Sequence, residues 1–218
     1  MILVDFQIKE AIQSDEIIME NFSEHCLQPA SYDMRIGEEG FTSDSKQVTN
    51  IKEKGMLLLK RGDFGVVSTY ESIELPPNFT ARIGMRSFFS RRGLVATTGP
   101  QIDPGYRGKL FIGLINLSPS DIALTFRQEF CTIEIHKLTE PSSNPYKGPY
   151  QDQLELTDKE IDPLIRQEGL SFPQLFTVLE TLSRDVGKLA DRVNMLIWVL
   201  PAITALGLIF IGIIVGLK

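Results

Sequence analysis

The chain contains 218 residues, 43% of them hydrophobic and 23% charged, which allows one sizeable domain with an appendage and excludes two large domains. Its formal net charge is −6, without a long run of basic residues. This excludes a nucleic-acid-binding surface, because phosphate neutralisation needs clustered lysine and arginine. The cysteines Cys26 and Cys131 and the histidines His25 and His136 are too few for a disulfide scaffold or a zinc-deaminase centre, so we expect buried thiols in a reducing compartment.

The N-terminal segment is predicted to begin with a short helix. Apolar residues recur near helical spacing within residues 5–13, and residues 16–19 are typical of a strand. The aspartate at position 5 and the absence of a long apolar core exclude a secretory signal peptide. From Met56 onward, short β-type runs separated by Gly, Pro, Asn and Asp turns predict an all-β barrel or jelly roll: MLLL, FGVVSTY, FTARIGM, GLVAT, LFIGLIN, IALTF and FCTIEIHKL.

Five segments follow one another in the order known from one superfamily: IKEAIQSDEIIME, SYDMRIG (Ser31, Asp33, Arg35, Gly37), the stretch from FGVVSTY to SFFSRRGL, QIDPGYRGKLFIGLIN, and NPYKGPYQDQ. Residues 1–153 thereby resemble the dCTP deaminase and dUTPase superfamily, with the layout of the deaminase branch. The resemblance implies a mainly β fold, a distorted β-barrel or jelly roll of the dUTPase-like type behind a short N-terminal helix. It also implies a bound deoxyribonucleoside triphosphate and a homotrimer with three sites at the subunit boundaries.

The turn RSFFSR carries Arg86, Ser87, Ser90 and Arg91. Guanidinium forks, hydroxyls and turn amides suit the negative charges of a triphosphate, and the segment resembles the family's phosphate-contacting R-S-S-x-A-R turn. Phe88 replaces a small residue of that pattern. Without the resemblance, these residues indicate only a basic turn.

The turn IDPGYRG holds Asp103, Tyr106, Arg107 and Gly108. In dUTPases, the resemblance implies, the equivalent aspartate orients or activates the water that attacks the α-phosphorus, and in deaminases it holds the sugar 3′-hydroxyl. Asp103 is therefore the candidate catalytic residue, and Tyr106 is expected to pack on the deoxyribose. From the residues alone, the segment predicts a β-turn with an exposed aspartate.

The following strand bears Ile112 and Gly113 where the deaminase branch has a Leu-Glu pair. That glutamate activates the attacking water, and glycine has no group that moves a proton. We therefore predict a substrate-binding role for Ile112 and no dCTP deaminase activity.

Asn144 to Gln153 resembles the family's segment that closes over a bound nucleotide, with Tyr146, Tyr150 and Gln153 in matching places. Hydrolysis of dUTP would need Mg²⁺ on the phosphates and a positioned water, and no side chain is predicted to bind the metal. Two departures count against hydrolysis. The segment QEFCTIEI (residues 128–135) does not match the dUTPase's fourth motif at the glutamine of that motif. No glycine-rich C-terminal arm is present either.

Beyond a linker at residues 154–172, residues 173–194 are predicted to form a coiled-coil helix. Its apolar seam alternates spacings of four and three through Leu175, Leu179, Leu182, Val186, Leu189, Val193 and Leu196. The resemblance favours three parallel strands, whereas valine at two a positions with leucine at d favours two. A helix packed on its own domain is the alternative.

The last segment, Met195 to Leu217, has 23 residues without a charge, roughly 34 Å as a helix and enough to cross a bilayer core of about 30 Å. A buried core helix is the alternative. We expect a single-pass, tail-anchored membrane protein with its folded domain in the cytoplasm.

Two functions follow from these features. The first is a membrane-anchored protein that binds a deoxyribonucleoside triphosphate and hydrolyses dUTP, or a related nucleotide, to the monophosphate and diphosphate. The alternative is a catalytically inactive sensor that couples nucleotide binding to a membrane effector helix.

Overall fold

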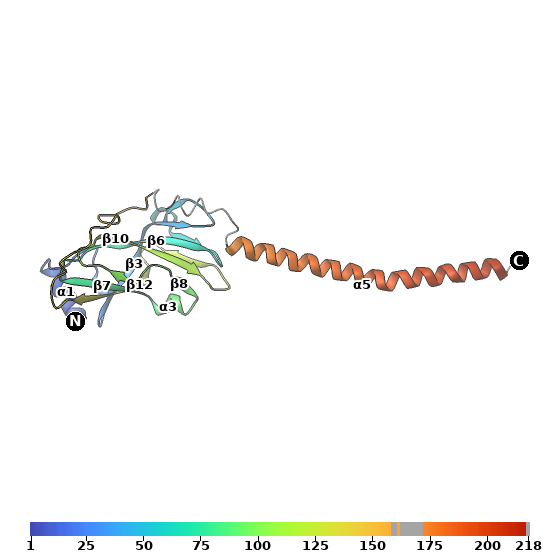
Figure 1. Cartoon of the computed structure of the whole chain (residues 1–218), viewed down its shortest axis with the longest axis horizontal. Helices are drawn as coiled ribbons and strands as arrows, with labels where there is room; N and C mark the ends of the chain where they lie inside the picture. The colour runs from blue at the N-terminus through green and yellow to red at the C-terminus, as the bar shows by residue number, and fades with distance from the viewer. Residues whose placement is uncertain (158–160, 162–171, 217–218) are drawn as a thin grey trace. The chain divides into compact units, whose positions relative to one another are not determined.

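The computed structural model of the chain describes residues 1–157, 161 and 172–216 (Figure 1). The chain divides into two compact units, Met1–Pro173 and Gln174–Lys218. Short helices of the first unit are α1 (Asp5–Gln13), η1 (Glu24–Cys26), α2 (Ile51–Lys54) and α3 (Ser87–Ser90). Its strands are β1 (Ile18–Glu20), β2 (Leu27–Gln28), β3 (Ser31–Thr42), β4 (Val48–Asn50), β5 (Met56–Leu59), β6 (Phe64–Glu74), β7 (Phe79–Met85), β8 (Leu94–Ala96), β9 (Gln101–Ile102), β10 (Arg107–Asn116), β11 (Ile122–Thr125) and β12 (Glu129–Lys137).

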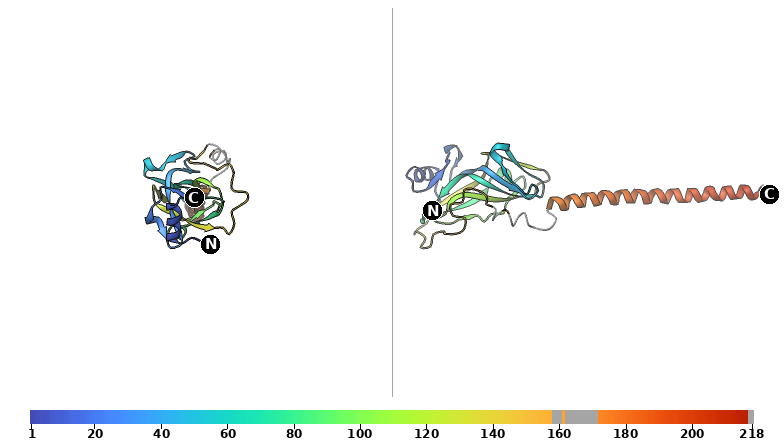
Figure 2. Two further views of the ribbon diagram at one scale, coloured as in Figure 1. Left: turned by 90° about the vertical axis from the view of Figure 1, so that its left-hand side faces the viewer. Right: turned by 90° about the horizontal axis from the view of Figure 1, so that it is seen from above.

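The strands form a curled antiparallel sheet, as Figures 1 and 2 show. Along its main path the order is β8-β10-β6-β3-β12-β7-β9, and β5 pairs separately with β11. Strand β10 lies inside the sheet, because it pairs with β6 on one side and with β8 on the other. The predicted mainly β fold, with its short N-terminal helix, is confirmed.

The β-type runs that the sequence pattern predicts from Met56 onward do not include strand β3. Strand β3 precedes that position and has 12 residues, and it pairs with both β6 and β12. Its burial pattern shows runs of two or three buried residues rather than alternation. A strand buried on both faces gives no period-two signal, so the sequence pattern did not reveal it.

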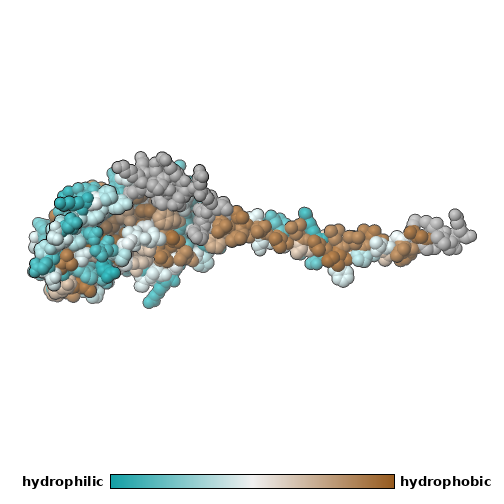
Figure 3. Space-filling view, in the orientation of Figure 1, coloured by the Kyte–Doolittle hydropathy of each residue, from teal (hydrophilic) through white to brown (hydrophobic). Residues whose placement is uncertain are grey.

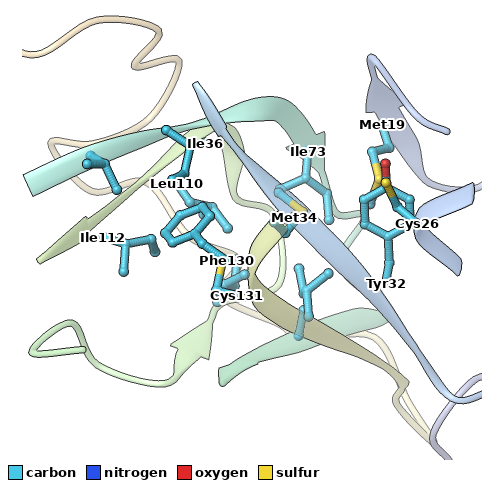
Figure 4. Close-up of a cluster of buried hydrophobic side chains, with 14 of the residues drawn as sticks. Met19, Cys26, Tyr32, Met34, Ile36, Ile73, Leu110, Ile112, Phe130 and Cys131 are labelled. Atoms are coloured by element: carbon cyan, nitrogen blue, oxygen red, sulfur yellow. The ribbon is translucent and has the colours of Figure 1, made fainter. Parts of the chain in front are cut away.

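The core of the first unit is a continuous cluster of buried side chains contributed by most of the strands (Figure 4). Met34, Ile112 and Cys131 are completely buried in it. Both cysteines are free and buried, as expected. Burial raises the pKa of the Cys131 thiol well above its ordinary value, so this thiol is held in its neutral form.

One buried carboxylate ties two central strands together. Glu71 of β6 is fully buried and accepts hydrogen bonds from the Tyr32 hydroxyl at 3.1 Å and from the Arg35 backbone amide at 2.9 Å. The Arg35 guanidinium adds a charged contact, with Nε 2.6 Å from Glu71 Oε1. Burial, followed by the negative charge of Glu71, raises the pKa of Tyr32. A buried charge is tolerated where it is paired and hydrogen-bonded in this way.

The described part of the second unit belongs to the helix α5 (Phe172–Gly216), which is apolar along much of its surface (Figure 3). One continuous helix therefore covers both the predicted coiled coil and the described part of the predicted span. Pro201 lies inside it, a residue type that bends helices. Leu175–Ile209 is long and apolar enough to cross a membrane. Most of the predicted linker and the last residue of the predicted span, Leu217, lie outside the described residues.

Candidate functional site

A cavity of about 620 Å³ lies beside β10. One part of its wall comes from β6, β10 and the segment between β8 and β9, and another from Tyr146, Tyr150, Gln153, Leu156 and Ile161. Of the residues predicted at the site or in the segment that closes over it, six line this cavity: Asp103, Tyr106, Ile112, Tyr146, Tyr150 and Gln153. The structure thus brings together side chains that the sequence separates by up to 50 positions.

The turn before β10 is shaped by two glycines. Gly105 and Gly108 have φ values of +86° and +143°, which side chains other than glycine adopt only with strain. The Gly105 amide donates to the Leu75 carbonyl at 2.9 Å. Asp103 stands exposed on this turn, and its Oδ1 accepts a hydrogen bond from Gln101 Nε2 at 2.8 Å. The expected β-turn with an exposed aspartate is therefore present, at the cavity wall.

Two tyrosines form a wall next to that aspartate. The Tyr106 hydroxyl donates to the Lys109 carbonyl at 2.6 Å, which fixes the ring beside the turn. The Tyr146 ring centroid lies 5.7 Å from that of Tyr106, at an interplanar angle of 59°. The Tyr146 amide donates to the Pro104 carbonyl at 2.7 Å. Both rings are therefore positioned by backbone contacts of the turn.

The closing segment, residues 144–153, is docked on this turn by its backbone. Gln153 forms a parallel bridge with Gly108, and its carbonyl accepts from the Lys109 amide at 2.9 Å. The Asp152 amide donates to the Arg107 carbonyl at 2.8 Å, and the two side chains form an ion pair. The hydrogen bond from Arg107 lowers the pKa of Asp152. The segment thus adds a short edge to β10.

The other end of the cavity lies at Gly113. The Gly113 amide donates to Thr98 Oγ1 at 2.7 Å, and its carbonyl accepts from the Thr97 amide at 2.8 Å. Both threonines line the cavity, as do the aromatic residues Phe64 and Phe111. No sequence pattern pointed to Thr97 or Thr98, because they reach the cavity only through the long-range pairing of β8 with β10.

The structure does not bring the predicted phosphate turn to this cavity. Arg86, Ser87, Ser90 and Arg91 are absent from its lining among the residues that the structure describes. Arg86 instead pairs with Glu129 and lies 3.2 Å from Asp33 Oδ2. Burial raises the pKa of Asp33, opposed by the hydrogen bond from Thr132 and by the charge of Arg86. Ser87 and Ser90 belong to α3, and Arg91 is exposed beside them.

Comparison with known proteins identifies the family. A sequence profile described as dCTP deaminase-like matches residues 2–138. The chain belongs to the dCTP deaminase-like family. The predicted superfamily is therefore confirmed.

Two curated relatives illustrate the extent of the match. The chain is 35% identical to a dCTP deaminase of Thermococcus sibiricus over 163 residues, which covers 74% of this chain and 99% of that protein. It is 32% identical over 170 residues to a dUMP-forming dCTP deaminase of Methanothermobacter thermautotrophicus, covering 69% of this chain and 86% of that protein. About a quarter of this chain thus has no counterpart in the Thermococcus relative.

A solved structure supports the fold. The crystal structure of 2′-deoxycytidine 5′-triphosphate deaminase from Agrobacterium tumefaciens matches with a TM-score of 0.52 and 20% sequence identity. The match covers 62% of this chain and 47% of that chain. The match indicates that the strands of this chain are arranged as in that structure.

Proposed function

We propose that residues 1–153 form a domain that binds a deoxyribonucleoside triphosphate in the cavity beside β10. The observation that carries the proposal is the cavity itself, about 620 Å³, a size typical of small-molecule sites. It is walled by the turn that carries Asp103 and by the docked segment that carries Tyr146 and Gln153. The family's curated relatives are named for action on dCTP, a ligand of this class.

Five of the lining residues have a proposed role. The Asp103 carboxylate accepts a hydrogen bond from the sugar hydroxyl or from a water near the α-phosphorus. The Tyr106 ring packs on the deoxyribose, and Ile112 lies along the base. Tyr146 and Gln153 cover the nucleotide from the closing segment.

We further propose that the triphosphate meets Arg86, Ser87, Ser90 and Arg91 of a neighbouring subunit in a homotrimer. The support is the position of this turn outside the cavity of its own chain, together with a cavity wall that holds no arginine among the described residues. Mg²⁺ would arrive on the phosphates, where it neutralises charge. Asp103 is the one carboxylate of the described lining, which fits a metal held mainly by phosphates and water.

Hydrolysis of dUTP, or of a related nucleotide, to the monophosphate and diphosphate is the proposed reaction. Asp103 would orient the attacking water and accept a proton from it, because an exposed carboxylate can act as a general base. The test is to incubate the full chain in detergent with each deoxyribonucleotide and Mg²⁺ and to measure product. Loss of turnover in Asp103→Asn supports the reaction, and wild-type protein that binds without turnover contradicts it.

A catalytically inactive nucleotide sensor is the second candidate. It is favoured by Gly113, which offers no base, and by Leu156, which lines the cavity and whose amide donates to Glu39 Oε2 at 2.7 Å. A ligand that shifts Leu156 would act on the segment that continues toward α5 in the sequence. This function is rejected if deoxyribonucleotides leave liposome permeability and protease cleavage after residue 153 unchanged.

Deamination of dCTP is not proposed, because no general base stands at residue 113. Rapid conversion of dCTP to dUTP by the purified full chain would contradict this.

For α5 we propose a three-stranded coiled coil at residues 173–194 and a membrane span at residues 195–217, with the domain in the cytoplasm. The seam side chains are exposed in the described helix, for example Leu182 at 58% and Leu189 at 58%. Leu182→Asp should lower the cross-linked trimer fraction, because a charge at a d position disrupts the core. Arg184→Asp, on the outer face, is the matched control. Dimers in the wild-type protein would reject the three-stranded form.

A further inference from the structure

The inner end of the cavity, at Gly113, is built from two neighbouring strands. Leu114 of β10 is paired with Ala96 of β8, so the residues that follow β8 lie over Gly113. A Cβ atom placed on Gly113 would come closer to Thr97 Oγ1 than real Cβ atoms approach another atom. The Thr97 hydroxyl therefore fills the place where a side chain of residue 113 would begin.

The polar groups around Gly113 differ in whether they already have a hydrogen-bond partner. The Gly113 amide donates a hydrogen bond to Thr98 Oγ1, and the Gly113 carbonyl accepts one from the Thr97 amide. Thr98 Oγ1 accepts that amide proton at 2.7 Å. The Thr97 side chain is exposed toward the cavity, and the described residues provide no hydrogen-bond partner for its hydroxyl. Thr97 is therefore the hydroxyl that a ligand can reach at this end.

A hydroxyl differs from a carboxylate in what it recognises. It donates one hydrogen bond and also accepts, whereas an ionised carboxylate only accepts. It therefore pairs with an amino group or with a carbonyl group of a ligand. A neutral hydroxyl also abstracts no proton from water at neutral pH.

We propose that Thr97 is the residue of this cavity that contacts the base. Its hydroxyl replaces a side chain at residue 113 and binds the polar edge of the base, so that amino-bearing and carbonyl-bearing pyrimidine deoxyribonucleotides bind about equally. Thr97 and Gly113 act as a pair, each requiring the other. The ligand part rests on the proposed nucleotide binding, whereas the pairing of the two residues does not.

Thermal melting of the full chain in detergent tests the pairing without any ligand. Gly113→Ala should lower the Tm by about 2–4 °C, because the Thr97 hydroxyl must move away from the added Cβ. In a Thr97→Ala background the same change should not lower the Tm, since the blocking atom is gone. Additive effects of the two substitutions would overturn the pairing.

Calorimetric binding of dCTP and dUTP tests the ligand part, without Mg²⁺ so that the proposed hydrolysis of dUTP does not occur. The wild-type protein should bind both within about threefold. Thr97→Val should weaken both by about three- to tenfold, the value of one lost hydrogen bond, and Thr97→Ser should keep wild-type affinity. Thr125→Val, an exposed threonine of β11 outside the cavity lining, is the matched control.

The outcomes separate the two proposals. A preference above tenfold for either nucleotide, or unchanged affinity in Thr97→Val, would overturn the role of Thr97 while nucleotide binding stands. Absence of binding by any deoxyribonucleotide would overturn nucleotide binding and the ligand part together, and the melting result would still decide the pairing.

Discussion

The two ends of the cavity lie along strand β10, about 15 Å apart, and differ in the groups that surround them. At the turn end, Gly108 and Lys109 of β10 are bonded to the closing segment through Gln153. At the inner end, Gly113 faces threonine hydroxyls and aromatic rings. The difference teaches that the framework for holding a ligand and the group for deaminating it are separable. We propose that this chain retains the first and lacks the second.

The largest expected effect is at the turn end. Asp103→Asn should lower any hydrolysis of dUTP by about 10²- to 10⁴-fold, because the amide no longer orients or deprotonates water. Steady-state kinetics of product formation with Mg²⁺ measure it. Asp152→Asn, another exposed carboxylate near the turn, is the control that should retain most activity. Equal loss in both variants would assign the effect to the turn's structure.

The docking of the closing segment can be broken at Gly108. Gly108→Ala should cost about 1–3 kcal/mol of stability, because residue 108 has φ +143° and a Cβ would lie 2.8 Å from the Gln153 carbonyl oxygen. Limited proteolysis should then cleave within residues 144–153 faster. Gly84→Ala is the control, since no atom lies within 4 Å of a Cβ placed there. Equal protease resistance in both would reject the docking.

The phosphate turn supplies the next test. Arg91→Ala should weaken deoxyribonucleotide affinity about tenfold while leaving the Tm unchanged, since this exposed arginine is proposed to reach a neighbouring subunit's ligand. Arg92→Ala is the control, because the Arg92 guanidinium stacks on the Phe88 ring at 3.6 Å. Titration calorimetry compares them, and equal affinities would remove this turn from the site.

The smallest effect concerns the support of the inner end. Asp63 precedes Phe64, is fully buried, and accepts from the Ser43 hydroxyl. Burial raises its pKa, so its contribution to stability is full below the unfolded pKa of about 3.9 and is lost as pH rises through the folded pKa. Asp63→Asn should therefore raise the Tm at pH 7, with a smaller gain near pH 4. A gain that grows toward low pH would contradict this.

How much of the structure can be predicted from the sequence depends on how far apart along the chain the contacting residues lie. The turn from Asp103 to Gly108 was predictable because Pro and Gly fix its backbone locally. The strand β3 was not, because burial on both faces removes alternation. Thr97 was not predictable either, because its position beside Gly113 depends on pairing between β8 and β10. The ion pairs of Arg86 with Asp33 and Glu129 likewise join residues 43 to 53 positions apart.

The central claim is that the cavity binds a deoxyribonucleoside triphosphate. Equilibrium dialysis of the full chain in detergent against labelled dCTP and dUTP, without Mg²⁺ so that dUTP is not hydrolysed, followed by chromatography of the retained label, tests it most directly. The account predicts about one retained nucleotide per chain and no deamination of dCTP. Retention no greater than that of heat-denatured protein, or dCTP recovered as dUTP, would contradict it.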